Sequence, residues 1–458
     1  MQFASLTFLF LFFPMTLGLY RLVPHRWKRE AMLVISVLFL LGGGLLSAGV
    51  LLLLTALTFF AGWLMERWKS RKGRSGLLLT GVVLGYLAVL VLLRSDWLRS
   101  WKTAYLDGTM FFPLGLAFFA LQGVGYCADV RRGVISAERN WRSFFLYMLF
   151  YPRLILGPAV SYRDAQRWEF QRAVSMEQTG AGLLRFVAGL AKKLLLADWV
   201  GMFFLSAAQT DFSGYSFLTA WLGVLAHLLS LYLELSGYAD MAIGLALCYG
   251  VKLPESYGKK LFYPSVLLFS AQWNRTVIQW FSQYVGGHLS SRNPLLRTIA
   301  VTLTWGCIGL WYGFRLPFLL WGIAIGLLLC LEHAMGERRT HTGFRYLLVG
   351  GLLSVGSLLL TMPDLAHVWS YCRILLGMEG IMPTESDFYF LRSYGLALLP
   401  ACYAATGHWR TLLRRAEHTL WFRRMRTVLT VSVSVLLLAG CVAVLFGIGG
   451  SAAMQLLI

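Results

Sequence analysis

Long apolar stretches, separated by short polar or basic segments, run through the whole chain. They continue for roughly 17–25 residues without alternating at every second position, which is typical of membrane-spanning helices rather than barrel strands. We therefore expect an all-α polytopic membrane protein with about 11–13 spanning and re-entrant helices. The expected spans are 3–20, 31–47, 49–65, 77–94, 110–127, 143–160, 179–206, 216–250, 295–313, 316–334, 344–362, 388–405 and 427–448.

Two of these stretches do not fit a single straight span. The block from Ala31 to Leu64 is interrupted by three glycines at 42–44, which predicts either two short helices or one kinked helix. The block from Ser216 to Gly250 is too long for one crossing and carries Glu234 and Asp240. A broken or re-entrant passage is expected there.

The connecting segments differ in character. Residues 163–178 mix both signs of charge and predict a solvated connection or a surface helix. Residues 252–292 are aromatic and polar together, which favours short helices that lie in the membrane interface or dip into the protein. Residues 408–426 are basic and predict an amphipathic surface helix. No internal repeat or soluble segment stands out, so residues 1–458 are expected to form a single transmembrane domain.

Composition excludes a soluble protein, because 58% of the residues are hydrophobic, 14% are charged and the mean hydropathy is +0.64. The net charge of +20 does not indicate nucleic-acid binding, since the basic residues form short clusters between apolar runs. That pattern is typical of loops on the cytosolic face of a membrane and of contact with anionic lipid headgroups. The clusters are Arg26–Arg29, Arg67–Arg74, Arg131–Arg132, Lys192–Lys193, Arg338–Arg339 and Arg410–Arg426.

The seven cysteines are scattered, mostly inside apolar runs, and show no spacing typical of metal ligands. We interpret them as small buried hydrophobic residues and expect no metal cofactor. The chain is expected to be a multi-pass protein of the cytoplasmic membrane, with membrane lipids around it and basic loops at 21–29, 67–74 and 410–426 facing the cytosol.

Polar residues concentrate between Leu235 and His333. This region places Asp240 in the apolar run Leu235–Gly244, and then contains the cluster Gln272-Trp-Asn-Arg275 and the sequence Gly309-Leu-Trp-Tyr-Gly313. Carboxylates, guanidinium groups and amides are costly inside a bilayer, so they indicate either a functional site or hydrogen bonds between helices.

Several sequences in this chain, in this order, resemble motifs of the membrane-bound O-acyltransferase family. They are Phe112-Pro-Leu-Gly-Leu-Ala-Phe-Phe-Ala-Leu-Gln122 with Tyr126 and Asp129-Val-Arg131, then Phe150-Tyr-Pro-Arg-Leu-Ile-Leu-Gly-Pro158, and then Ser236-Gly-Tyr-Ala-Asp-Met-Ala-Ile-Gly244. The resemblance covers essentially the whole chain. It is strongest to the bacterial branch of alginate O-acetylation proteins and D-alanyl transfer proteins of teichoic acids.

The resemblance implies a helix bundle around a central tunnel. It also implies a cytosolic thioester donor, such as acetyl-CoA or an acyl carrier protein, and an acceptor on the outer side. That acceptor would be the hydroxyl group of a cell-surface polysaccharide, or a partner from an acyltransferase or polysaccharide machinery that relays the acyl group, expected to be acetyl.

One position departs from the family motif. The family's general base is a His in the sequence Gly-Leu-Trp-His-Gly, whereas this chain has Tyr312 there. A tyrosine hydroxyl titrates near 10, so Tyr312 does not act as a resting base, although it can donate a hydrogen bond to an oxyanion or act as an activated nucleophile. The upstream motif survives as Gln272–Arg275 but has Val277 in place of its His.

The candidate catalytic residues are Tyr312, His333 and Asp240. His333 follows Glu332 near the end of the next helix, which is consistent with an acid–base pair or with a solvated pair at a helix end. Asp240 either forms hydrogen bonds within the bundle or contacts the substrate. The candidate substrate-binding residues are Trp273, Asn274, Arg275, Trp311, Ser236 and Tyr238. Among them, Arg275 suits a donor phosphate or pantetheine carbonyl, or a structural ion pair.

Two functions remain open from the sequence. The first is an active O-acyltransferase with altered site chemistry. The second is a catalytically degenerate family member that serves as an acyl conduit or scaffold in a polysaccharide modification complex. A transporter is disfavoured, because transporters typically contain paired broken helices in two related halves.

Overall fold

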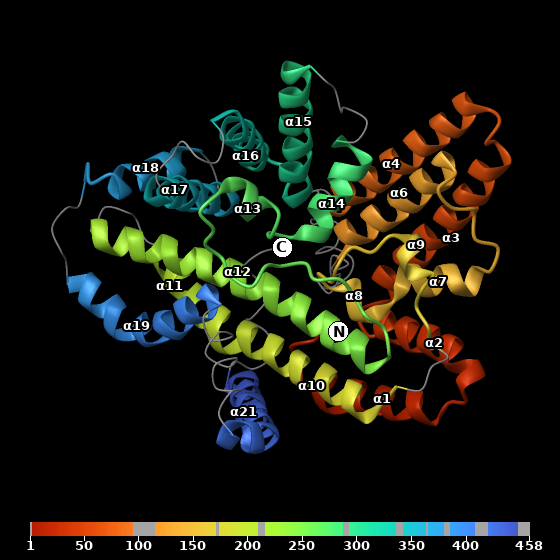
Figure 1. The fold of residues 1–458 in the computed structure, drawn as a ribbon, viewed down its shortest axis with the longest axis horizontal. Helices are drawn as coiled ribbons and strands as arrows, with labels where there is room; N and C mark the ends of the chain where they lie inside the picture. The colour runs from red at the N-terminus through yellow and green to blue at the C-terminus, as the bar shows by residue number, and fades with distance from the viewer. Residues whose placement is uncertain are drawn as a thin grey trace, which may run out of the picture. The chain divides into compact units, whose positions relative to one another are not determined.

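The computed structural model describes residues 2–94, 115–170, 174–208, 216–286, 293–335, 342–362, 365–379, 385–407 and 420–447. These ranges are helical and contain no β-strand, which confirms the all-α class (Figure 1). Residues 112–114 of the first motif, Arg338–Arg339 and residues 408–419 of the expected surface helix lie outside the described residues.

The helices group into two compact units. The first unit comprises Met1–Phe186 and Ala239–Glu255, and the second comprises Val187–Tyr238 and Ser256–Ile458. Two helices, α10 (Met176–Ala191) and α12 (Phe217–Cys248), contribute residues to both units. The expectation of a single domain and the central tunnel both stay predictions.

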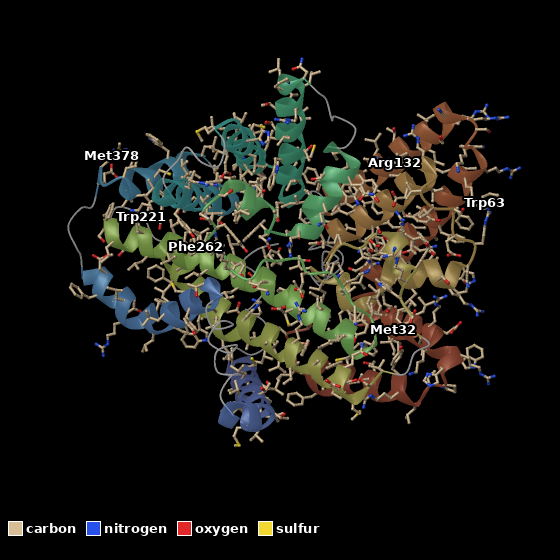
Figure 2. All side chains as sticks on the ribbon, viewed as in Figure 1. Met32, Trp63, Arg132, Trp221, Phe262 and Met378 are labelled. Carbon is tan, nitrogen blue, oxygen red and sulfur yellow. The ribbon has the colours of Figure 1, made fainter. Side chains whose placement is uncertain are left out.

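The first unit is built from the N-terminal helices, in which α3 packs against α2, α4, α6 and α7 (Figure 1). Its remaining helices are α1 (Phe13–Leu22), α2 (Lys28–Leu41), α3 (Leu45–Arg67), α4 (Lys72–Arg94), α6 (Leu116–Arg132), α7 (Trp141–Leu149), α8 (Tyr151–Leu154) and α9 (Tyr162–Ala165). Met32 on α2 is fully buried in this unit, whereas the Trp63 side chain on α3 is 39% exposed (Figure 2).

The glycines at 42–44 separate two helices, as one of the two sequence predictions stated. Gly44 has φ +122°, a conformation that side chains with a Cβ rarely adopt. By contrast, the prediction of one span over 143–160 is wrong, because α7 ends at Leu149 and the short α8 follows. Phe150 adopts ψ 100°, and Pro152 in the first turn of α8 has no amide hydrogen with which to continue the preceding helix.

The second unit contains the C-terminal helices together with α11. They are α11 (Asp198–Ala208), α13 (Val266–Ser270), α14 (Arg275–Tyr284), α15 (Pro294–Tyr312), α16 (Leu316–Met335), α17 (Thr342–Thr361), α18 (Leu365–Leu375), α19 (Glu385–Thr406) and α21 (Leu420–Gly447). The helices α13 and α14 confirm the short helices expected between residues 252 and 292.

The expected break between Ser216 and Gly250 is wrong, because α12 is one continuous helix of 32 residues. At about 1.5 Å per residue it extends about 48 Å, beyond the roughly 30 Å of a bilayer core. Its polar side chains find partners on neighbouring helices instead of breaking the helix. For example, His227 Nε2 lies 2.6 Å from Thr361 Oγ1 on α17.

Six helices in the described ranges are long and apolar enough to cross a membrane. Two of them are mostly exposed: in the 18-residue apolar windows of Thr427–Gly447 and Lys72–Leu92, 11% and 17% of the residues are buried. In the corresponding window of α12, 72% of the residues are buried. The first two helices therefore have lipid-facing surfaces, whereas the polar-bearing α12 is an internal helix. The total of eleven to thirteen spans stays a prediction.

Candidate functional site

Tyr312 is the last residue of α15, at the tip of a helical hairpin with α16. The hairpin is tight because Gly309 and Gly322 face the opposite helix. A Cβ at Gly309 would lie 2.1 Å from the carbonyl oxygen of Phe318, and one at Gly322 would lie 2.2 Å from that of Trp305. Small residues at such positions let membrane helices approach closely. They fix the end of α15 against the start of α16.

Trp273 and Asn274 lie in the turn between α13 and α14. Asn274 has φ 42° and ψ 51°, a left-handed conformation that asparagine tolerates better than most residues. The turn is attached to the segment before α13, because the Arg275 amide donates to the Ser256 carbonyl at 2.7 Å and the Gly258 amide donates to the Gln272 carbonyl at 2.7 Å. This attachment holds the Asn274 side chain away from its own helix.

The hydroxyl of Tyr312 receives two hydrogen bonds from this turn. Trp273 Nε1 donates to Tyr312 Oη at 3.2 Å, and Asn274 Nδ2 donates to the same oxygen at 3.2 Å. An indole N–H donates and does not accept, so the tyrosine oxygen is the acceptor in the first bond. A hydroxyl has two lone pairs and one proton. Both lone pairs are engaged, and the described residues provide no acceptor for the proton.

Aromatic rings surround this hydroxyl. The ring centroids of Trp311 and Trp321 lie 5.0 and 5.5 Å from that of Tyr312, both edge to face. Tyr257 packs edge to face on Trp273 at 5.7 Å. Burial raises the pKa of the Tyr257 phenol well above its ordinary value, so this hydroxyl stays neutral. We call Tyr312, Trp273 and Asn274 the Tyr312 centre; its walls are apolar and its polar groups are uncharged.

Arg275 directly follows Asn274 and is partly exposed. Its Nε donates to the carbonyl of Ala271 at 3.2 Å. Within the ranges that the structure covers, no carboxylate pairs with this guanidinium. The described residues therefore give no support to the structural ion pair predicted for Arg275. Its alternative role, binding an anionic group of the donor, stays a prediction.

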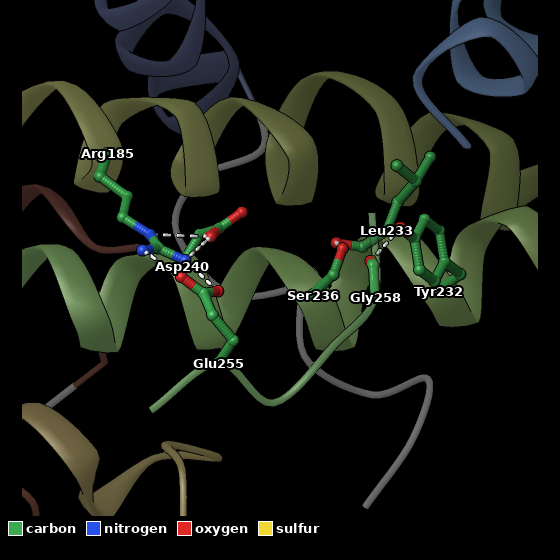
Figure 3. Close-up of polar contacts among 7 residues, drawn as sticks. All are labelled: Arg185, Tyr232, Leu233, Ser236, Asp240, Glu255 and Gly258. Atoms are coloured by element: carbon green, nitrogen blue, oxygen red, sulfur yellow. Dashed lines mark hydrogen bonds and ion pairs between the residues drawn. The ribbon is translucent and has the colours of Figure 1, made fainter. Parts of the chain in front are cut away.

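Asp240 belongs to the first unit and pairs with Arg185 on α10 (Figure 3). Its Oδ1 accepts from Arg185 Nε at 3.0 Å and from Nη2 at 2.8 Å, and the same guanidinium donates to Glu255 at 2.8 and 2.6 Å. Close contact of α10 with α12 makes the pair possible, since a Cβ at Gly244 would lie 2.6 Å from the Gly182 carbonyl. These contacts favour the bundle role of Asp240 over substrate binding.

Ser236 and Tyr238 lie on α12 among residues of the second unit. The Ser236 hydroxyl donates to the Leu233 carbonyl of its own helix at 3.4 Å (Figure 3). Tyr238 is 2% exposed. The neighbouring Tyr232 donates to the Gly258 carbonyl at 2.9 Å, which ties α12 to the segment that holds the Trp273–Asn274 turn. The structure brings neither Ser236 nor Tyr238 into contact with Tyr312, and their predicted roles remain untested.

His333 lies exposed near the end of α16. It is 17 residues beyond Leu316, about 25 Å along the helix from the end that lies beside Tyr312. The adjacent Glu332 accepts from the Leu267 amide at 2.9 Å and from Arg345 at 2.8 Å. The structure therefore separates His333 from Tyr312 and engages Glu332 with other partners.

The assignment of Lys192–Lys193 to the basic clusters of membrane-flanking loops is wrong for Lys193, whose side chain is 1% exposed and contacts Asp198 and Glu234. Neither this group nor Arg185 as the partner of Asp240 was predicted from the sequence. The available signal was an acid five residues after a lysine inside an apolar run, with further acids on the next long helix.

Comparison with known proteins bears on the same region. The sequence profile of the membrane-bound O-acyltransferase family matches residues 140–356, which include the whole Tyr312 centre. A protein of Pseudomonas fluorescens named probable alginate O-acetylase is 30% identical over 358 residues, covering 75% of this chain and 68% of the relative. A protein of the same name from Azotobacter vinelandii is 28% identical over 430 residues, covering 88% and 83%. The peptidoglycan O-acetyltransferase of Helicobacter pylori is 25% identical over 293 residues, covering 57% and 54%.

These matches confirm the resemblance found in the motifs and extend over most of the chain. With the apolar helices and the bacterial relatives, they make this a multi-pass protein of the bacterial inner membrane. Proteins of this kind use acyl donors. The chain belongs to the membrane-bound O-acyltransferase family.

Proposed function

We propose that this protein transfers an acyl group, expected to be acetyl, from a thioester donor toward hydroxyl groups of a cell-surface polysaccharide. Membership of the family supports acyl transfer, and the names of the relatives, O-acetylases of alginate and an O-acetyltransferase of peptidoglycan, support the substrate class. The proposed donor is acetyl-CoA or an acylated carrier protein. The acyl group reaches the polysaccharide directly or through an extracytosolic relay partner.

The observation that carries the proposal is the polarity of the Tyr312 hydroxyl. Because Trp273 and Asn274 both donate to its oxygen, its proton is directed away from them. A donor held in this way suits the carbonyl oxygen of a thioester, which becomes negatively charged when an alcohol attacks. The site thus provides oxyanion stabilisation instead of the histidine base of the family motif.

The reaction balances without a change in the charge of Tyr312. The acceptor oxygen attacks the carbonyl carbon, an ester C–O bond forms and the C–S bond breaks. The proton of the acceptor hydroxyl passes to the leaving sulfur, which departs as a thiol. Tyr312 keeps its proton throughout and strengthens its hydrogen bond as charge develops on the carbonyl oxygen.

Neighbouring residues have supporting roles in this proposal. Trp273 and Asn274, predicted from the sequence as substrate contacts, instead position the Tyr312 hydroxyl. Trp311 forms an apolar wall beside it. Arg275 has no carboxylate partner among the described residues and suits an anionic part of the donor, such as a phosphate, because guanidinium groups bind phosphate well. The proposal makes no use of His333.

The test is acyl transfer by the purified protein in nanodiscs, with labelled acetyl-CoA and deacetylated alginate as acceptor. Tyr312→Phe keeps the ring and removes the donor, so turnover should fall by about 10²–10³-fold with little change in KM for the donor. Tyr346→Phe, an exposed tyrosine on α17, is the matched control and should behave as wild type.

Two results would contradict the proposal. Unchanged turnover in Tyr312→Phe would exclude the oxyanion role. Donor binding without turnover in the wild type, with carrier-protein donors and partner proteins also supplied, would favour the acyl conduit or scaffold.

A further inference from the structure

A second polar group lies buried in the second unit, formed by Lys193, Asp198 and Glu234. The Lys193 Nζ pairs with Asp198 Oδ1 and lies 3.2 Å from Glu234 Oε1. The three side chains are 1%, 10% and 8% exposed, respectively. Ionisable groups this deeply buried in a membrane protein are costly, and they persist where they serve a purpose. We call these residues the Lys193 triad.

A local change of helix type brings Lys193 and Asp198 together. Residues Lys192–Ala197 form a π-helical segment between α10 and α11. In an α-helix, residues five apart point about 140° away from each other. In a π-helix the hydrogen bonds connect residues five apart, so their side chains lie on one face. Short π-helical segments are rare and are frequently found at functional sites.

The third member, Glu234, is held in place by close contact of α12 with this segment. A Cβ at Gly237 would lie 2.8 Å from the Gly189 carbonyl oxygen and 3.4 Å from the Lys193 amide nitrogen. On the other side of Glu234, the Ser230 hydroxyl donates to the Ala197 carbonyl at 3.0 Å. The two contacts flank Glu234 and fix its position against Lys193.

The charges of the Lys193 triad do not balance. One ammonium group faces two carboxylates, which leaves a net charge of −1 if all three are ionised. Both carboxylates also face Tyr238, which carries no positive charge. Within the described side chains of α19 and α21, no cation acts on Asp198. An uncompensated charge in an apolar interior costs far more than neutralising it by protonation.

One atom is available to carry the neutralising proton. Asp198 Oδ2 is buried and has no hydrogen-bond partner in the described part of the chain, whereas Oδ1 of the same carboxylate pairs with Lys193. Buried polar atoms are nearly always hydrogen-bonded, so an orphaned carboxylate oxygen beside a second carboxylate is unusual.

We propose that Lys193, Asp198 and Glu234 form a proton-binding site, in which the two carboxylates hold one proton with Asp198 Oδ2 as the atom that carries it. The bound proton makes the buried group neutral. Two carboxylates that share a site titrate as a pair, so the proton belongs to the pair. This site does not depend on the proposed acyl transfer, and its test needs no turnover.

Infrared spectroscopy of the purified wild-type protein in nanodiscs, at neutral pH, tests the proposal directly. A protonated carboxyl gives a carbonyl stretch that shifts in heavy water and is distinct from that of a carboxylate. The wild type should show this band. Asp198→Asn and Glu234→Gln should each lose it, since each leaves one ammonium group and one ionised carboxylate. Glu177→Gln, at an exposed acid on α10, should leave the band unchanged.

In Lys193→Met the infrared band of the protonated carboxyl should change in the opposite direction. This substitution removes the cation and leaves two buried carboxylates, so both should be protonated and the band should grow. If this variant does not fold, the two isosteric variants Asp198→Asn and Glu234→Gln still decide the question.

Thermal unfolding gives an independent measurement. A folded state that holds one proton more than the unfolded state loses stability as pH rises, by about tenfold in the folding equilibrium per pH unit. This loss begins above about pH 4, where unfolded carboxyls release their protons. The wild type should show this loss of stability with rising pH, and Asp198→Asn should not. Absence of the band in the wild type would overturn the proposal. So would stability that depends on sodium concentration instead of pH, because a metal ion would then neutralise the site.

Discussion

The Tyr312 centre and the Lys193 triad are both polar groups among apolar helices of the second unit, and they are built in opposite ways. The Tyr312 centre contains neutral groups, and within the described residues its hydrogen bonds leave one donor proton without a partner. The Lys193 triad contains charged groups that are bonded mainly to one another. A neutral, incompletely bonded centre suits a passing substrate, whereas a closed charged group suits a bound proton.

This difference determines which property a substitution changes. Removing the Tyr312 hydroxyl deletes a neutral group at the tip of a hairpin and leaves no charge behind. Removing one partner of a buried ion pair leaves the other charge without compensation, and this is strongly destabilising. We therefore expect variants of the Tyr312 centre to lose chemistry and variants of the Lys193 triad to lose stability.

The largest effect is expected for Lys193→Met. The two carboxylates lose their cation, and the free energy of unfolding should fall by about 3–5 kcal/mol. Tyr312→Phe leaves the Trp273 and Asn274 donors without their acceptor, so it should lower the free energy of unfolding by about 1–3 kcal/mol, less than Lys193→Met. Thermal or denaturant unfolding of both variants measures the difference in stability. Lys192→Met, a substitution at the partly exposed neighbouring residue, is the control. Equal stability of Lys193→Met and wild type would show that the triad is not a closed charged group.

The next effect comes from the α15–α16 hairpin. Gly322→Val places side-chain atoms where a Cβ already lies 2.2 Å from the Trp305 carbonyl, so the helices must separate. Overpacking of this kind costs about 1–3 kcal/mol, and it should also lower acyl transfer because Tyr312 moves relative to the turn at 273–274. Gly350→Ala on α17 is the control, since no atom lies within 4 Å of its Cβ. Full activity in Gly322→Val would show that the hairpin does not position Tyr312.

The sequence predicted the class and most helix positions because long apolar runs are a direct physical requirement of the bilayer. It did not predict the continuity of α12. The acids Glu234 and Asp240 suggested a break, but each pairs with a cation from a neighbouring helical segment, Lys193 and Arg185. Such compensation depends on tertiary packing, and a linear sequence does not show which cation lies opposite which acid.

The candidate site shows the same limit. The motif located Tyr312, Trp273 and Asn274 in one region of the chain, and the structure places their polar atoms in contact. The direction of the hydrogen bonds, from which the proposed chemistry follows, required coordinates. Lys193 was assigned to a basic cluster of a membrane-flanking loop because its neighbour Lys192 is also basic. The π-helical segment that turns Lys193 inward has no marker in residue type.

Two substitutions of Asn274 should have smaller effects. They separate its left-handed backbone conformation from the hydrogen bond that it donates to Tyr312. Asn274→Gly tolerates the left-handed backbone and removes one donor to Tyr312, so activity should fall about tenfold while stability changes little. Asn274→Asp replaces a donor by an acceptor that can take the Tyr312 proton, so its activity should approach that of Tyr312→Phe. Steady-state turnover measures the difference, and Asn274→Gly should be the more active of the two variants. Equal activity of the two would mean that the proton of Tyr312 has no role.

The smallest effect is expected for Asp240→Asn. Arg185 keeps both of its bonds to Glu255, and the amide oxygen of asparagine can still accept from its guanidinium. The pair is partly exposed, with side chains 28% and 15% accessible, so the loss in the free energy of unfolding should be about 1 kcal/mol or less. Turnover should stay within about threefold of wild type, because Asp240 is bonded to Arg185 and has no part in the proposed reaction. A loss of turnover much larger than this, with unfolding unchanged, would give Asp240 a direct role at the substrate.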